Sequence, residues 1–346
     1  MEDIRYDRAE ILHRLRYIKP ASSFRSAYSY SNYGFTEGGV AAAKAIGKAW
    51  ADLSNEKLYK PLSMTTTSSR YADYLSRANR AELHVPVDGK WVAVVKGGKD
   101  AQAPTGGVSS SVRDLGQWVR LQLGNGKFDG KQLIRDDAFA QTRQPLILSG
   151  TDLTTGGPSF YGLGCVVSYD AHGRMRMGYG GVFSVGVRTA VSLIPSEQLG
   201  VVVLTNAYPT GAPEAISETF FDLVHDDTST RDWLTEFNKV FASLLEQAET
   251  AAQVYKTPPA TPSLALSLAA YVGTYANDYL GSVQVVEKGG ALELQVGPNK
   301  KPYTLKHFDR DLFTFTPIGR AARHPNPGDL SERTESKGNP GGYQNF

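Results

Sequence analysis

The sequence predicts an α+β fold, with an antiparallel sheet flanked by helices and a smaller β-domain after it. Turn residues separate consecutive β-rich runs between residues 161 and 205, a pattern typical of antiparallel strands. Segments with apolar residues at helical spacing occupy residues 9–20, 36–53, 213–225 and 230–251. A Pro-rich stretch then precedes further short β-rich runs, which indicates a second domain.

The composition is that of an ordinary globular protein. Of 346 residues, 41% are hydrophobic and 21% charged, and this length allows two compact units. A net charge of +2 gives no reason to expect nucleic acid or an acidic membrane surface as a partner. Cys165 is the single cysteine, which excludes an internal disulfide and a cysteine zinc cluster. There is no membrane-spanning apolar run and no signal-peptide pattern, and the cellular compartment stays open.

The individual elements follow from local patterns. Ser111 and Asp114 match a capping box, which predicts a helix start after the Gly/Ser-rich loop at residues 104–111. The β-rich runs of the first domain are Tyr161–Tyr169, Arg174–Met177, Val185–Ile194 and Leu199–Thr205. Those of the second domain begin with Tyr271–Tyr275 and continue with Ser282–Glu287, Leu292–Val296, Tyr303–His307 and Leu312–Thr316.

One loop contains the first candidate catalytic residues. Tyr30 and Asn32 lie two residues apart in a Ser/Gly-rich segment that leads into the helix expected from Thr36. Both polar ends can point to one place. A phenol whose pKa is lowered from about 10 can transfer protons, and an asparagine amide can orient a substrate carbonyl.

The residues around this pair resemble a known motif. Phe24-Arg25-Ser26 followed by Tyr28-Ser29-Tyr30-Ser31-Asn32 is similar to the second motif of the class C β-lactamases and penicillin-binding-protein-like serine hydrolases, which include the family VIII carboxylesterases. Further similar segments lie at residues 61–65, 79–84, 88–90, 106–118 and 202–206, and in the first of them Ser63 stands where the similar Pro-Leu-Gly-Met turn of the family has glycine. The resemblance covers residues 10–206 and, more weakly, 267–317. It implies a β-lactamase/transpeptidase-like fold followed by a lipocalin-like β-barrel domain.

The resemblance also implies a third motif, His-x-Gly or Lys-Thr-Gly on an edge strand, where backbone N–H groups help to form the oxyanion hole. Its counterpart here is Gly178-Tyr179-Gly180-Gly181, which adds Tyr179, Gly180 and Gly181 to the candidate catalytic residues. Tyr179 stands where the family has His or Lys, and the spacing to Gly186 is one residue longer. The alternative interpretation is a glycine hairpin with a surface tyrosine.

In the family, a Ser-x-x-Lys segment with the nucleophile precedes the Tyr-x-Asn motif, and here that motif begins at residue 30. We therefore expect a chain that is truncated before this motif. Ser54-Asn55-Glu56-Lys57 matches the string but follows Tyr30, and we reject it as the nucleophile. Ser109, Ser110 and Ser111 are other candidate hydroxyls, with no lysine in register. The truncation would expose a sheet edge, which predicts a homodimer through that edge or a rearranged edge.

The family implies no cofactor, although a divalent metal such as zinc stays possible. No two histidines are spaced as metal ligands on one helix face, and His84 with nearby carboxylates is the best starting point for a site built from distant residues. Taken singly, each histidine is interpreted as structural or exposed. The histidines are His13, His84, His172, His225, His307 and His324.

The predicted domains are a β-lactamase/transpeptidase-like domain at 1–256, without its N-terminal part, a linker at 257–265, a lipocalin-like β-domain at 266–318 and a disordered tail at 319–346. We expect a bacterial hydrolase of activated ester or amide bonds with a non-standard nucleophile, acting on a small-molecule ester, amide or β-lactam. One alternative is a metal-dependent hydrolase of phosphate, sulfate or carboxyl esters. Another is a pseudoenzyme that binds a ligand or peptidoglycan without turnover.

Overall fold

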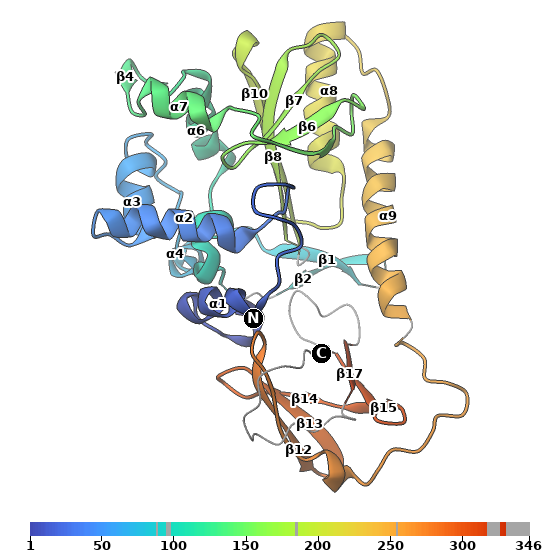
Figure 1. Cartoon of the computed structure of the whole chain (residues 1–346). Coiled ribbons are helices and arrows are strands. Elements are labelled where there is room, and N and C mark those ends of the chain that lie inside the picture. The colour runs from blue at the N-terminus through green and yellow to red at the C-terminus, as the bar shows by residue number, and fades with distance from the viewer. Residues whose placement is uncertain (88, 95–97, 184–185, 254, 317–325, 330–346) are drawn as a thin grey trace. The chain divides into compact units, whose positions relative to one another are not determined.

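The computed structural model describes the chain except for residues 88, 95–97, 184–185, 254, 317–325 and 330–346 (Figure 1). Its contacts group into two compact units. One unit comprises residues 20–242. The other combines residues 1–19 with the chain from residue 243 onward.

A six-stranded antiparallel sheet forms the centre of the unit of residues 20–242, with strand order β10-β9-β8-β7-β6-β5. Consecutive strands are neighbours throughout, which confirms the antiparallel arrangement predicted for residues 161–205. The run from Tyr161 is split by a turn at Gly164, whose φ of 91° a glycine adopts without strain. The strands are β5 (Ile147–Thr151), β6 (Pro158–Tyr161), β7 (Val166–Tyr169), β8 (Met175–Phe183), β9 (Val187–Ile194) and β10 (Leu199–Thr205).

Strand β8 is longer than the sequence pattern indicated. The predicted run ended at Met177, but the strand continues through the glycines to Phe183, and Gly181 pairs with Thr189 of β9. The glycine-hairpin interpretation of this segment is therefore wrong. On its other side β8 pairs with β7 only as far as Gly178. Among the described residues, positions 179–183 thus have a strand neighbour on one side alone, as expected for a motif on a sheet edge.

Helices and two small hairpins complete this unit. Helices α6 and α8 contact β10, and α8 also contacts β9. Trp233, Phe237 and Phe241 of α9 form a buried cluster with Ala215 of α8. The hairpins pair β1 (Leu83–Val87) with β2 (Lys90–Val94) and β3 (Lys127–Phe128) with β4 (Lys131–Gln132). The helices are α2 (Asn32–Ala45), α3 (Trp50–Ser54), α4 (Tyr71–Ser76), α5 (Ala103–Gly106), α6 (Val112–Leu123), α7 (Asp136–Thr142), α8 (Ala212–Asp226) and α9 (Trp233–Gln253).

Two predicted helix boundaries have different outcomes. The single helix expected from Thr36 to Leu53 is wrong, because α2 ends at Ala45 and α3 begins at Trp50. Gly47 has a φ of 68°, and the Lys48 N–H bonds the Ala43 carbonyl at 2.9 Å, which is a helix-ending turn that glycine favours. By contrast, the predicted cap at α6 is confirmed, since Ser111 Oγ accepts the Asp114 N–H at 3.2 Å.

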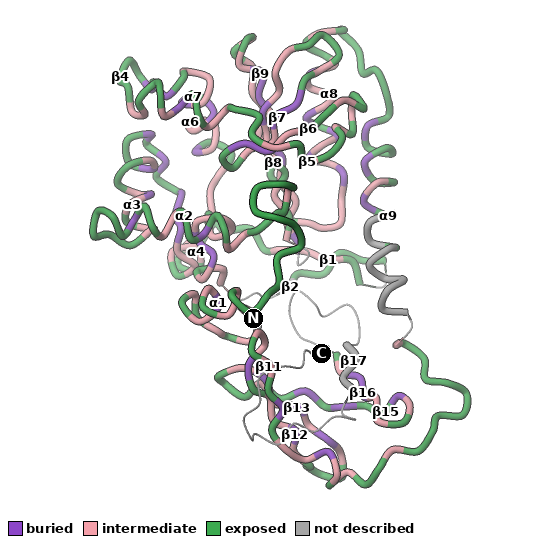
Figure 2. The backbone as a smooth tube through the Cα atoms, in the orientation of Figure 1, coloured by how far each residue is buried: buried purple, intermediate pink, exposed green. Residues whose placement is uncertain are grey.

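Figure 2 shows in purple the buried positions of the chain, and the segment at residues 61–65 contributes two of them to the core of this unit. Leu62 and Met64 pack with Tyr59, Leu121 and Phe128. Ser63 lies between them with a φ of 56°, at the position where the resembling family has glycine. The left-handed backbone there turns both apolar neighbours inward, which gives a physical reason for the family's glycine.

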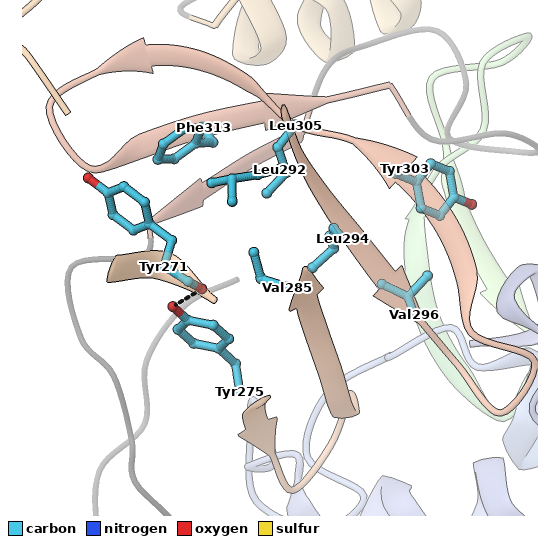
Figure 3. Packing of buried hydrophobic residues seen from close by; sticks show 9 residues of the cluster. All are labelled: Tyr271, Tyr275, Val285, Leu292, Leu294, Val296, Tyr303, Leu305 and Phe313. Atoms are coloured by element: carbon cyan, nitrogen blue, oxygen red, sulfur yellow. Dashed lines mark hydrogen bonds between the residues drawn. The ribbon is translucent and has the colours of Figure 1, made fainter. Parts of the chain in front are cut away.

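The second unit is built mainly from β-strands. Aromatic and aliphatic side chains of its two antiparallel sheets share one core (Figure 3), in which the rings of Tyr271 and Phe313 lie 4.9 Å apart. The first sheet contains β11 (Gly273–Asn277), β12 (Gly281–Lys288), β13 (Ala291–Val296) and β14 (Lys301–Thr304). The second contains β15 (Lys306–Asp309), β16 (Leu312–Phe315) and β17 (Asn326–Asp329). Helix α1 (Arg8–Arg14) also belongs to this unit.

The strands of this unit agree with the predicted runs, except that the run Tyr303–His307 is divided between β14 and β15. Closure into a lipocalin-like barrel stays a prediction, as do the proposed domain ranges. Residues 326–329 of the predicted disordered tail form β17, because they pair with β16. The rest of the tail from residue 319 lies outside the described residues.

Candidate active site

The local structure of the Tyr30 loop follows from a helix cap. Ser31 has an extended backbone, and its Oγ accepts the Gly34 N–H at 3.0 Å, so that α2 begins at Asn32. Tyr30 therefore lies in extended chain and Asn32 in the first helical turn. The cap orients their side chains toward each other, and Tyr30 Oη donates a hydrogen bond to Asn32 Oδ1 at 2.8 Å.

Tyr179 joins this pair from a distant part of the chain. Its hydroxyl oxygen lies 2.5 Å from that of Tyr30, a short hydrogen bond across 149 residues of sequence. Because strand side chains alternate, Tyr179 and Gly181 share one face of β8 and Gly180 faces the other way. The structure thus brings Tyr30, Asn32 and Tyr179 together. An oxyanion-hole role for Gly180 and Gly181 stays a prediction.

Two buried ion pairs hold the opposite face of β8 and β9 against α8. Arg176 makes a bidentate pair with Glu218, with oxygen–nitrogen distances of 2.7 and 2.8 Å. Nearer the site, Arg188 pairs with Glu214 in the first turn of α8, and a Cβ on Gly180 would come within 3.3 Å of the Arg188 guanidinium. Burial raises the pKa of Glu214 although Arg188 opposes this effect. These pairs fix the strand segment from which Tyr179 projects.

A pocket of about 570 Å³ opens beside the Tyr30 loop. It is lined by residues of the segment 27–39, by Leu146 and Ile147 at the start of β5, and by Tyr161 and Gly162. Sequence reasoning missed Phe35, Leu146 and Tyr161 as site residues. Phe35 follows the motif at helical spacing and could have been suspected. Tyr161 had no local signal, because only the sheet brings the end of β6 to this loop.

The pocket lining is uncharged. The described residues that line it are aromatic, aliphatic, serine or glycine, without Lys, Arg, His, Asp or Glu. Burial, with smaller contributions from the neighbouring Tyr30 and Tyr28, raises the pKa of Tyr161 to about 12. Burial also raises the pKa of Tyr28, and burial together with the Tyr30 hydrogen bond raises that of Tyr179. These three neighbours of Tyr30 therefore remain neutral phenols at physiological pH.

The candidate serines outside the Tyr30 loop, Ser54 and Ser109 to Ser111, make structural hydrogen bonds. Ser54 is buried and bonds the Ala51 carbonyl, whereas the Lys57 side chain is 64% exposed and pairs with Glu56. This pair therefore does not form a nucleophile with a buried lysine, in agreement with the prediction. Ser110 exchanges a hydrogen bond of 2.7 Å with Thr67. Ser109 pairs by its backbone with Ser68, and Ser111 caps α6.

The proposed starting point for a metal site is not supported by its neighbours. His84 in β1 is tied to residue 206, since its backbone N–H bonds the Asn206 carbonyl at 2.8 Å and its Nδ1 lies 3.3 Å from the same oxygen. In the described part of the chain, no three His, Cys, Asp or Glu side chains are grouped so that they could hold a metal ion. A search of the same residues found no helix both long and apolar enough to cross a membrane.

The antiparallel sheet with α6 and α8, together with the Tyr30–Asn32 and Tyr179 motifs, defines a β-lactamase/transpeptidase-like scaffold. The profile of the β-lactamase family matches residues 1–222, and the chain belongs to this family. A domain of unknown function, DUF3471, matches residues 256–321.

The chain is also similar to individual proteins. The chain is 23% identical over 335 residues to the unguisins hydrolase ungD of Aspergillus violaceofuscus, covering 89% of this chain and 59% of that protein. The octameric penicillin-binding protein homologue from Pyrococcus abyssi matches with a TM-score of 0.53 and 17% identity, over 93% of this chain and 65% of that one. A class C β-lactamase from Rhodobacter sphaeroides matches with a TM-score of 0.49 and 23% identity, over 64% of this chain and 66% of that one. The chain thus spans less than two thirds of the first two relatives.

The raised phenol pKa values predict how stability depends on pH. Between pH 10 and about 12 the unfolded chain loses the Tyr161 proton while the folded protein keeps it. The free energy of unfolding should therefore fall as the pH rises through this range. The Tyr161→Phe variant should show a shallower decline, and the exposed control Tyr169→Phe should follow the wild type. Urea unfolding at closely spaced pH values measures these slopes, and equal slopes for all three proteins would contradict the prediction.

Proposed function

We propose that this protein is a hydrolase of activated ester or amide bonds, with a small-molecule ester, amide or β-lactam as substrate. The observation that supports this most is the convergence of Tyr30, Asn32 and Tyr179 on one point beside a pocket, with hydrogen bonds of 2.8 and 2.5 Å. A relative whose name describes it as a hydrolase supports the same class of reaction.

The directions of the hydrogen bonds suggest which of the three residues transfers a proton and which orients the substrate. Each hydroxyl has one proton to donate. Since Tyr30 donates to Asn32 Oδ1, Tyr179 must donate to Tyr30, which gives a chain running from Tyr179 through Tyr30 to Asn32. Asn32 Nδ2 can then orient a substrate carbonyl. Tyr30 can turn its proton to the developing oxyanion or to the leaving group, and Tyr179 can replenish it.

The nucleophile in this proposal is a water molecule or a non-standard serine. Ser29 and Ser31 both flank Tyr30 and line the pocket, and Ser29 is the candidate because the Ser31 hydroxyl caps α2. A neutral phenol is a poor base, so hydrolysis should be slow and limited to activated bonds. In well-studied hydrolases, roughly 10³–10⁴-fold acceleration over water survives the loss of the catalytic triad.

A binding protein without turnover is the second candidate. The uncharged lining favours it, because no cation among the described lining residues would stabilise a phenolate at Tyr30. The metal-dependent hydrolase remains the third. Loss of activity on chelation would distinguish the metal-dependent hydrolase from the ester or amide hydrolase. The absence of turnover would identify the binding protein.

The function is tested with activated carboxyl, phosphate and sulfate esters, before and after treatment with a chelator. We expect hydrolysis of carboxyl esters that the chelator does not affect. Tyr30→Phe should lower kcat about a hundredfold because it removes the transferable proton, and Ser29→Ala shows whether that hydroxyl takes part. Tyr169→Phe, on an exposed strand end, is the matched control. Activity that a chelator abolishes and zinc restores would replace this proposal with the metal-dependent one, and no turnover at all would leave the binding protein.

We also propose a homodimer through a sheet edge. Strand β10 pairs with β9 alone among the described strands, and its residues Leu199–Thr205 form a continuous apolar run in which Leu204 is 36% exposed. An unpaired apolar edge favours pairing with another copy. Sedimentation velocity should show a dimer, which Leu204→Lys should shift toward monomer. A monomeric wild-type protein, or a dimer that Leu204→Lys does not affect, would contradict this edge as the interface.

A further inference from the structure

We propose that the pocket beside Tyr30 selects substrates with an uncharged aromatic or branched apolar group next to the bond that is cleaved. This inference rests on the proposed function, since it names the substrate class of the same site. Its basis is the chemistry and geometry of the lining, and it assigns the specificity to Tyr161, Tyr28, Phe35 and Leu146.

Tyr161 is the centre of the aromatic lining. It is 8% exposed, and three other rings surround it in different orientations. Tyr28 lies 5.4 Å away at an interplanar angle of 40°, Phe35 lies 5.8 Å away at 70°, and Tyr30 lies 6.4 Å away at 84°. Rings that meet edge to face present both edges and faces to a ligand, an arrangement that suits another aromatic ring.

Leu146 lies directly before β5 and is 53% exposed, so it adds an aliphatic, solvent-accessible surface to the pocket lining. A volume of about 570 Å³ accommodates a substituted ring together with the bond to be cleaved. Tyr30 lines the same pocket and is hydrogen-bonded to Asn32, so a carbonyl attached to the bound ring would lie near this pair.

A charged group would be disfavoured in this pocket. It would lose hydration without gaining an opposite charge from any described lining residue. An apolar group, by contrast, gains affinity with its size, about fourfold for each buried methylene. The same pocket therefore rejects both carboxylates and ammonium groups, a discrimination that a single positive or negative side chain could not produce.

Equilibrium binding tests this without turnover, with phenylacetamide and cyclohexylacetamide as neutral probes and with 4-carboxyphenylacetamide and 4-(aminomethyl)phenylacetamide as charged ones. In NMR titrations, we expect both neutral probes to bind at least about tenfold more tightly than both charged probes. Tyr161→Ala should abolish the binding of the neutral probes. Leu146→Asp, at an exposed position that tolerates substitution, should shift the preference toward the ammonium probe. Leu153→Ala, which is 65% exposed and outside the pocket, is the control.

The outcomes separate this proposal from the proposed function. If the protein prefers the neutral probes but hydrolyses no ester, the proposed hydrolase function is wrong and the proposed pocket specificity is supported. If the protein hydrolyses esters but binds charged and neutral probes equally, the hydrolase function is supported and the pocket specificity is wrong. Tight binding of the neutral probes that persists in a folded Tyr161→Ala protein and in Leu146→Asp would overturn the pocket proposal as well.

A second inference comes from independent contacts in the other unit. We infer that residues 1–19, which group with the C-terminal β-unit, stabilise its strands β12 and β13, although the β-lactamase profile includes these residues in its own match. Tyr6 Oη donates to the Leu280 carbonyl at 3.2 Å, and Arg14 donates to the Asp278 carbonyl at 2.8 Å. Ile4 packs against the core cluster shown in Figure 3.

Glycines mark the places where the two segments approach most closely. A Cβ on Gly281 would collide with the Tyr6 hydroxyl, and a Cβ on Gly297 would collide with the Ile4 backbone carbonyl. Backbone atoms cannot move aside as a flexible side chain can. The start of β12 and the end of β13 therefore leave room for the N-terminal segment. We call residues 1–19, which pack against these strand ends, the strap.

The full-length chain offers a matched pair for testing this. Gly297→Ala and Gly289→Ala both place alanine at a left-handed backbone, with φ of 71° and 60°, but a Cβ on Gly289 meets nothing within 4 Å. Trypsin should cleave at Arg5, Arg8 and Arg14 about tenfold faster in Gly297→Ala than in Gly289→Ala, because the strap is released. Amide exchange in β12 and β13 should rise with it. Equal cleavage and exchange in the two variants would overturn the inference.

Discussion

The pairing of β8 with β9 through residues 178–183 is the constraint on which the candidate site depends. It keeps a glycine-rich segment extended, so that Tyr179 projects from one face while Gly180 faces the buried ion pair on the other. A hairpin at these glycines would have placed Tyr179 at the surface. Because the strand continues beyond its pairing with β7, the tyrosine lies on a one-sided edge, where the Tyr30 loop meets it.

The two arginine pairs and the phenol cluster show how charge is distributed around that strand. Buried charges need partners, and Arg176 and Arg188 find theirs on α8, with cation–π contacts to Phe221 and Phe241. The described residues that line the pocket beside Tyr30 are uncharged, and burial raises the phenol pKa values of Tyr161 and Tyr179. The proposed site therefore offers hydrogen bonds and apolar contacts to a ligand, without a charged lining residue among those described. It also links the chemistry proposed for Tyr30 to the ligands proposed for the pocket.

The second unit raises a different question about how the chain is organised. Its core joins two small sheets, with Tyr271 almost fully buried and hydrogen-bonded to Asp311 at 2.5 Å. Residues from the beginning of the chain complete it, so that its sequence is discontinuous. A domain boundary drawn from linkers and composition places these residues in the first domain, because nothing in residues 1–19 indicates a partner more than 250 residues away.

The order and type of most elements could be predicted from the sequence, because apolar periodicity, turn residues and the Ser111 cap are local signals. The sequence also contained the signal for the candidate site. Tyr30, Asn32 and Tyr179 could be assigned to one site through the resemblance of their motifs to the β-lactamase family. The tertiary structure decided what local patterns cannot encode. It extended β8 through the glycines and placed Tyr161 and Leu146 beside the Tyr30 loop. The physical reason is the same in each case: sheet pairing and packing act between residues that are distant in the chain, and a sequence pattern records only near neighbours.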